Sequence, residues 1–163
     1  MNDAAIMADS HEIVVDEVFP HPPEVVWKTL TTPALIGRWL KMMPTGFEPT
    51  KGKRFTYQTT PAGQWDGVIH CLVLDVIPNE RLVYEWKGGH DANADYGSRL
   101  ETVVTWTLSK VDGGARVRLV HSGFRRPRND FAFKRMSEGW PGVLQRIEIV
   151  AGEGYSTKAN SNG

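Results

Sequence analysis

Hydrophobic and polar residues alternate in patterns that predict a strand, two short helices, a group of strands and a long C-terminal helix. Residues 11–19 are rich in β-branched residues and alternate in part, and Pro20, Pro22 and Pro23 stop them. Two apolar runs with helical spacing follow, and each begins with a proline, which suits the first turn of a helix. We therefore expect a strand over 11–19 and helices over 23–31 and 33–40.

Strand patterns dominate the middle of the chain. The predicted strands cover residues 54–58, 67–77, 81–87, 99–109 and 115–123. The sequences "PNE" (78–80) and "DGG" (112–114) are typical of tight turns, and short turns between successive strands indicate an antiparallel sheet. In contrast, we interpret the polar, glycine-bearing segment 88–98 as a solvated loop.

A sheet with one apolar face needs a cover, which only the C-terminal segment is long enough to provide. Its apolar residues recur at helical spacing: Phe133, Met136, Trp140, Val143, Leu144 and Ile147. Gly139, Pro141 and Gly142 interrupt this pattern. We expect the glycines to allow close approach to neighbouring backbone and the proline to permit a kink, so that the helix follows a curved sheet.

Composition limits the classes of protein to consider. The 163 residues are 40% hydrophobic, which fits one domain over 11–151 with flexible tails at 1–10 and 152–163. The 19 basic and 19 acidic residues give zero net charge, so nothing global attracts nucleic acid. We see no signal peptide and no span of about 18 apolar residues, and therefore expect a soluble, cytoplasmic protein without membrane insertion. The single cysteine, Cys71, lies in an apolar run and is expected in the core.

Four stretches in this order resemble a known family: residues 22–40, "VIPNERLVYEW" (76–86), 103–124 and "GWPGVLQRIEIV" (139–150). They are similar to the helix-grip superfamily of START domains, birch-pollen-allergen-like proteins and polyketide cyclases. Within it, the chain resembles the group named after the C-terminal domain of the Hsp90 ATPase activator. The resemblance implies an α+β fold, in which a curved antiparallel sheet of six to seven strands grips a long C-terminal helix around an internal cavity.

Catalytic and metal sites have little support in the sequence. The five histidines lack metal-ligand spacing and there is no paired cysteine, so we expect no metal and no cofactor. Ser122 and His121 are adjacent on a strand and point to opposite faces, which argues against a nucleophile–base pair. His121 itself falls on the inward face with Val117 and Leu119. It is either a general base or a core histidine with hydrogen-bond partners inside the protein.

Inward-facing aromatic and apolar residues predict a ligand cavity between sheet and helix. The predicted lining residues are Phe55, Tyr57, Tyr84, Trp86, Thr102, Val104, Trp106, Leu119, His121, Phe133, Met136, Trp140 and Leu144. A basic cluster at Arg125, Arg126 and Arg128, followed by Lys134 and Arg135, is either a clamp at the cavity rim for an anionic group or a solvated loop.

Three functions follow from these features. The aromatic set, without a catalytic constellation, favours a binding protein for a small hydrophobic or amphipathic molecule of lipid or polyketide type. The first alternative is a cyclase- or hydrolase-type enzyme with His121 as base and Tyr84 orienting the substrate. The second, suggested only by the family name, is a chaperone partner; the activator's separate N-terminal domain has no room in this chain, which argues against ATPase activation. The sequence fits a monomer or a homodimer.

Overall fold

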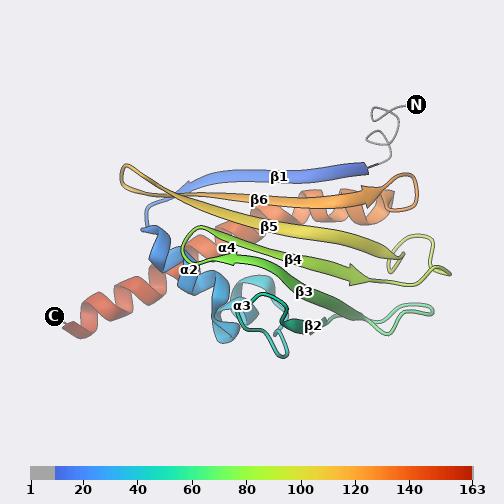
Figure 1. Ribbon diagram of the computed structural model, residues 1–163, viewed down its shortest axis with the longest axis horizontal. Coiled ribbons are helices and arrows are strands. Elements are labelled where there is room, and N and C mark those ends of the chain that lie inside the picture. Colours follow the sequence, from blue (N-terminus) through green and yellow to red (C-terminus); the bar gives the residue numbers. More distant parts are fainter. Residues whose placement is uncertain (1–9, 163) are drawn as a thin grey trace.

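The computed structural model describes the backbone of residues 10–162 and the side chains of residues 11–153. Within that part of the chain, the order of elements agrees with the hydrophobic pattern (Figure 1). The strands are β1 Ser10–Phe19, β2 Arg54–Gln58, β3 Val68–Ile77, β4 Arg81–Gly88, β5 Leu100–Val111 and β6 Gly114–Arg125. The helices are α2 Pro23–Thr31, α3 Pro33–Leu40 and α4 Asp130–Asn162. The predicted α+β fold is therefore confirmed.

The six strands form one antiparallel sheet in the order β1-β6-β5-β4-β3-β2. The first strand lies beside the last, so β1 and β2 are the two edges. β5 and β6 form a hairpin around Asp112 and Gly113, and Gly113 has the positive φ of 81° that the turn requires. Burial alternates along β5 and β6 as the sequence predicts, so one face of the sheet carries the apolar side chains.

All three helices lie on the same side of the sheet (Figure 1). α4 packs against α2, α3, β1 and β6. Trp140, Leu144 and Ile147 are buried on the face of α4 that points to the sheet. Trp39 of α3 enters the same space and donates its indole N–H to the Thr29 carbonyl at 2.9 Å. The core is therefore formed between the apolar face of the sheet and the three helices.

α4 is continuous across its glycines and Pro141, and the expected role of the glycines is wrong. A Cβ added to Gly139 would meet no atom within 4 Å, and one added to Gly142 would meet only the Arg146 side chain at 3.9 Å. Neither glycine lies against neighbouring backbone, because both are on parts of α4 that do not face the sheet closely. Pro141 is exposed, so the hydrogen bond it cannot donate is lost away from the core. In Figure 1 the direction of α4 changes between its two halves, as helices do at proline.

The C-terminal helix also continues further than the sequence predicts. Its backbone is helical through residues 152–162, where we expected a flexible tail. Polar composition alone does not end a helix, and no proline follows Pro141 in the chain. The other predicted tail, residues 1–10, lies outside the described residues except for Ser10, which begins β1. None of the helices within 10–162 combines the length and apolar character needed to cross a membrane.

Candidate functional site

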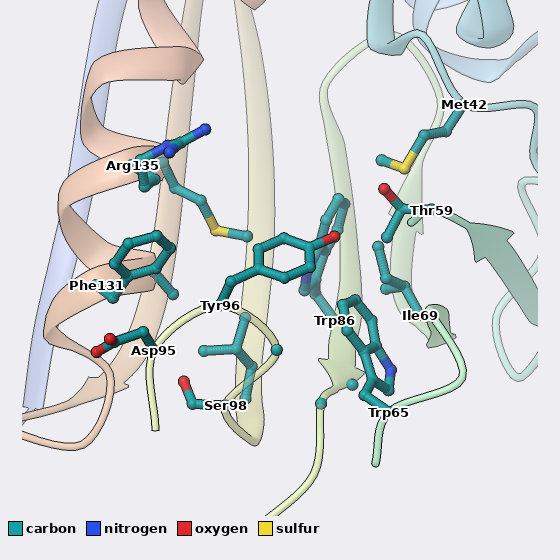
Figure 2. Close-up of a pocket in the computed structure, with 16 residues that line it drawn as sticks. Met42, Thr59, Trp65, Ile69, Trp86, Asp95, Tyr96, Ser98, Phe131 and Arg135 are labelled. Atoms are coloured by element: carbon teal, nitrogen blue, oxygen red, sulfur yellow. The ribbon is translucent and has the colours of Figure 1, made fainter. Parts of the chain in front are cut away.

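A pocket of about 210 Å³ opens at one end of the sheet (Figure 2). Its walls come from the β2–β3 loop, the ends of β3 and β4, the β4–β5 loop and the first turns of α4. The pocket therefore lies between sheet and C-terminal helix, as expected, but at the end of the sheet where the loops meet α4.

Two loops distant in sequence are tied together to form this wall. Asn93 in the β4–β5 loop donates its amide N–H to the Ala62 carbonyl at 2.8 Å and accepts from the Gln64 backbone N–H at 3.2 Å. The Tyr96 hydroxyl donates to the Thr60 carbonyl at 2.7 Å. Segment 88–98 is largely exposed, as expected of a solvated loop. It is also hydrogen-bonded to the β2–β3 loop and lines the pocket, which its sequence did not indicate.

Aromatic and aliphatic side chains make up most of the lining. Trp65 and Tyr96 lie with ring centroids 5.8 Å apart, and the Trp65 indole N–H is already used by the Val68 carbonyl at 3.1 Å. Trp86 of β4 lines the pocket (Figure 2), and so does Met136 of α4. Surfaces of this kind bind apolar molecules, because rigid rings offer large contact areas at a small cost in side-chain entropy.

Charged groups occur at the pocket only in exposed positions. The Arg135 guanidinium lies over the Phe131 ring, 5.6 Å from its centroid, and Asp95 belongs to the opposite loop. Both side chains belong to exposed residues. In Figure 2 the Asp95 carboxylate points away from the middle of the pocket. The interior is therefore uncharged, and its charges are confined to the mouth.

Ser98 differs from the other buried polar side chains because its hydroxyl has no hydrogen-bond partner in the described part of the chain. The residue is only 3% exposed and lines the pocket. Its Oγ is the one fully buried side-chain nitrogen or oxygen without a hydrogen-bond partner among residues 11–153. Buried hydroxyl groups are nearly always hydrogen-bonded in folded proteins, so Ser98 is an exception. Its Oγ exposes less than 1 Å², so the hydroxyl is not reached from the pocket.

Most of the predicted cavity residues lie in the packed core beside the pocket. Trp86 and Met136 line the pocket. The others do not line it and are buried or partly buried in the core: Phe55, Tyr57, Tyr84, Thr102, Val104, Trp106, Leu119, His121, Phe133, Trp140 and Leu144. Edge-to-face contacts connect their rings, with centroids 5.8 Å apart for Trp106–Trp140 and for Trp39–Trp106. Trp39 and Trp140 are buried in the space between sheet and helices, and the pocket lies at the loop end of that space.

His121 is fully buried in a complete hydrogen-bond chain. The Trp140 indole N–H donates to His121 Nδ1 at 3.0 Å, which makes that nitrogen an acceptor. His121 Nε2 therefore carries the proton and donates to Thr102 Oγ at 2.8 Å, and Thr102 donates in turn to the Trp86 carbonyl at 2.7 Å. Burial lowers the pKa of His121 to about 3, so the ring is neutral. Both ring nitrogens are occupied by protein groups, and His121 is a core residue rather than an available base.

The second residue of the predicted catalytic pair is also occupied. The Tyr84 hydroxyl accepts the Trp106 indole N–H at 3.1 Å, and burial raises its pKa. Cys71 is buried in β3, as expected, and burial raises the pKa of its thiol as well. Among residues 11–153, no three His, Cys, Asp or Glu side chains gather in a way that would hold a metal ion.

The predicted basic rim is largely paired with carboxylates. Arg126 Nε lies 2.7 Å from Asp130, and Arg128 forms an ion pair with Asp91. Asp91 also accepts from Arg99 at 2.9 Å, and this hydrogen bond lowers the pKa of its carboxyl. Neither these arginines nor Arg125 line the pocket. Of the predicted basic cluster, only Arg135 therefore lines the pocket; the paired arginines at 125–128 fit the alternative of a solvated loop.

Several pocket residues were not predicted from the sequence, among them Trp65, Tyr96 and Ser98 in loops and Phe131 at the start of α4. A signal for two of them was present. Trp65 stands between Gly63 and Gly67, and Tyr96 precedes Gly97, so large rings are set in glycine-bearing loops. Large aromatic residues in such loops indicate that the loops pack against something. No comparable signal exists for Ser98.

Comparison with known proteins finds one matching family model and several solved structures of similar fold. The family model described as "Activator of Hsp90 ATPase homolog 1-like protein" matches residues 20–152. The crystal structure of protein MLL2253 from Mesorhizobium loti is 36% identical, with a TM-score of 0.74, and the match covers 88% of this chain and 98% of that one. No match was found among curated proteins.

More distant structures share the fold. CalU16 from Micromonospora echinospora is 20% identical with a TM-score of 0.66, and the match covers 87% of this chain and 76% of that one. The Aha1 dimer from Colwellia psychrerythraea is 19% identical with a TM-score of 0.64, and the match covers 85% of this chain and 93% of that one. The resemblance stated from sequence motifs is thus confirmed.

Proposed function

Because this chain belongs to the family of Activator of Hsp90 ATPase homolog 1-like proteins, whose fold suits ligand binding, we propose that it binds a compact, mostly apolar small molecule. The binding site is the pocket between the β2–β3 loop, the β4–β5 loop and α4. The observation that carries the proposal is the aromatic lining formed by Trp65, Trp86 and Tyr96 around an uncharged interior.

The size of the pocket narrows the ligand class. Drug-sized ligands usually occupy about 300–1,000 Å³, whereas a cavity of about 150 Å³ in another protein holds benzene. A volume of about 210 Å³ therefore suits a molecule of one or two rings. A long acyl chain would extend into solvent, so an aromatic ligand is preferred to the lipid considered from the sequence.

The pocket is proposed to bind rather than to convert its ligand. Ser98 has no base within hydrogen-bond distance, the Tyr96 hydroxyl is engaged by Thr60, and His121 is held by Trp140 and Thr102. Acid–base or nucleophilic catalysis needs an activated group beside the substrate. The alternative of a chaperone partner is supported by the family description and by the name of the Colwellia protein.

Titration with naphthalene, followed by tryptophan fluorescence and by backbone amide NMR shifts, tests the proposal. Ala132 lies in the lining and Ala34 is exposed on α3, so they offer a matched pair of alanines. Ala132→Phe should fill the pocket and abolish binding, whereas Ala34→Phe should leave the affinity unchanged. Absence of saturable binding to the unmodified protein, or equal binding by Ala132→Phe, would refute the proposed function.

A further inference from the structure

We propose that the pocket binds aromatic molecules that carry one anionic group, such as a carboxylate, and that Arg135 at the pocket mouth recognises this group. The inference rests on the proposed function, because it specifies the ligand of the same pocket. Its starting point is the contrast between an apolar interior and Arg135, the one positively charged side chain among the described residues that line the pocket.

Arg135 is held at the mouth by a contact within its own helix. Phe131 lies one turn earlier on the same face of α4, and the Arg135 Cζ lies over its ring, 5.6 Å from the centroid. A contact over the ring face leaves the guanidinium N–H groups, which lie in the guanidinium plane, free to donate elsewhere. In Figure 2 the nitrogen end of Arg135 is turned from α4 towards the side of the pocket on which Met42 lies. These donors can therefore meet a group that protrudes from the pocket.

The Arg135 guanidinium forms no ion pair with a carboxylate of residues 11–153. Two arginines of the same basic cluster, Arg126 and Arg128, are paired with carboxylates, whereas the printed contact of Arg135 is with a ring. The other charged residue of the lining is Asp95, on the opposite loop, and in Figure 2 its carboxylate points away from the middle of the pocket. A ligand anion at Arg135 therefore does not have to displace a carboxylate of the protein.

The two parts of the pocket would orient such a ligand. Its ring system would be buried against Trp65, Trp86 and Leu100, where a carboxylate would lose its water without gaining an opposite charge. At the mouth the carboxylate keeps part of its hydration and gains the guanidinium. The same positive charge repels an ammonium group, although aromatic walls by themselves attract cations. An aromatic anion is therefore the class of ligand that suits both the lining and the mouth.

Four probes with one ring system and different charges test the inference: naphthalene, 2-naphthamide, 2-naphthoate and 2-naphthylmethylammonium, titrated at pH 7 and low ionic strength. The unmodified protein should bind 2-naphthoate about fivefold more tightly than 2-naphthamide, the factor that corresponds to a favourable exposed ion pair. The ratio of these two affinities should decrease when salt is added, because salt screens charges at the protein surface. The ammonium probe should bind more weakly than the amide.

Three variants assign the preference to Arg135 and to the pocket. Arg135→Gln removes the charge and keeps an amide donor, so the ratio of the 2-naphthoate affinity to the 2-naphthamide affinity should fall from about five to about one. Lys134→Gln is the matched control, because it removes a neighbouring positive charge that is exposed and does not line the pocket, and it should keep the ratio. Ala132→Phe, which fills the pocket, should abolish binding of 2-naphthoate.

The outcomes distinguish this inference from the proposed function. If naphthalene does not bind, the proposed function fails, and this inference fails with it. If naphthalene binds but 2-naphthoate shows no gain that depends on Arg135, only the role of Arg135 is overturned. Binding of 2-naphthoate that survives in Ala132→Phe would mean that the anion is held outside the pocket. Tightest binding of the ammonium probe, lost in Asp95→Asn, would mean that the ligand is a cation, and either result would also overturn the inference.

Discussion

The buried His121 should make the protein markedly less stable in mildly acidic solution. In the folded state its pKa is about 3, against an ordinary value of 6.5, because burial disfavours the charged ring. Protonation would also place a hydrogen on Nδ1, the atom that accepts the Trp140 indole N–H at 3.0 Å. Between these two pKa values the unfolded chain binds a proton that the folded protein does not, so the free energy of unfolding falls as the pH falls.

The size of the effect follows from the difference between the pKa values. Each pKa unit corresponds to about 1.4 kcal/mol, and pH 5 lies about 1.5 units below the unfolded value, so lowering the pH from 7.5 to 5 should cost about 2 kcal/mol. The carboxyl groups with lowered pKa, those of Asp16 and Asp91, lose their stabilisation only below their ordinary value of 3.8. They therefore do not contribute between pH 5 and 7.5.

Urea denaturation followed by tryptophan fluorescence, at several pH values between 5 and 7.5, measures this free energy. His121→Gln is the matched variant, because an amide side chain offers a donor and an acceptor but does not titrate in this range. The two pH profiles should differ by about 2 kcal/mol between the limits, whatever constant penalty the substitution itself brings. Side-chain ¹⁵N NMR of the unmodified protein should show the tautomer with hydrogen on Nε2. Parallel pH profiles, or a His121 ring that titrates near 6.5, would refute the reasoning.

Three further predictions concern single positions. Gly139→Ala should raise the free energy of unfolding by about 1 kcal/mol in urea denaturation, because the added methyl group meets open space and alanine favours the helix; a loss of stability would contradict the described surroundings. Gly89→Ala should lower the free energy of unfolding by about 2–3 kcal/mol in the same assay, because alanine at a φ of 83° is strained and its Cβ would clash with the Ser98 carbonyl. An unchanged free energy of unfolding would show that this loop is folded differently. Cys71 should react with a thiol reagent only after unfolding in denaturant, because the residue is 3% exposed and burial raises the pKa of its thiol. A rapid absorbance change on adding the reagent in native buffer would contradict this.

Periodicity was sufficient to predict the strands and helices, because it depends on the chain only locally. Alternation along Leu100–Val111 and Gly114–Arg125 follows from one buried and one exposed face of the sheet, and both faces were assigned correctly. The helical spacing of Trp140, Leu144 and Ile147 likewise identified the buried face of α4. Prolines at 23 and 33 marked the starts of α2 and α3. In each case the signal lies within a few residues of the element that it predicts.

The same periodicity could not locate the pocket. It indicates that a side chain points inward, but it carries no information about whether residues distant in sequence fill the space opposite. His121 was correctly placed inside, yet its role depended on Trp140 and Thr102, which occupy both ring nitrogens. The loop residues Asn93 and Tyr96 became part of the site only through hydrogen bonds to another loop.

The sequence by itself therefore determined the elements, their inward faces and the family, since these depend on local pattern and on motifs in order. Tertiary structure decided where the interior is packed and where it is open. Trp39 and Trp140 are buried in the space between sheet and helices, whereas the loops at its end line the pocket. A void is the difference between the volume that a backbone encloses and the volume of the side chains within it, and neither is a property of any single stretch of sequence.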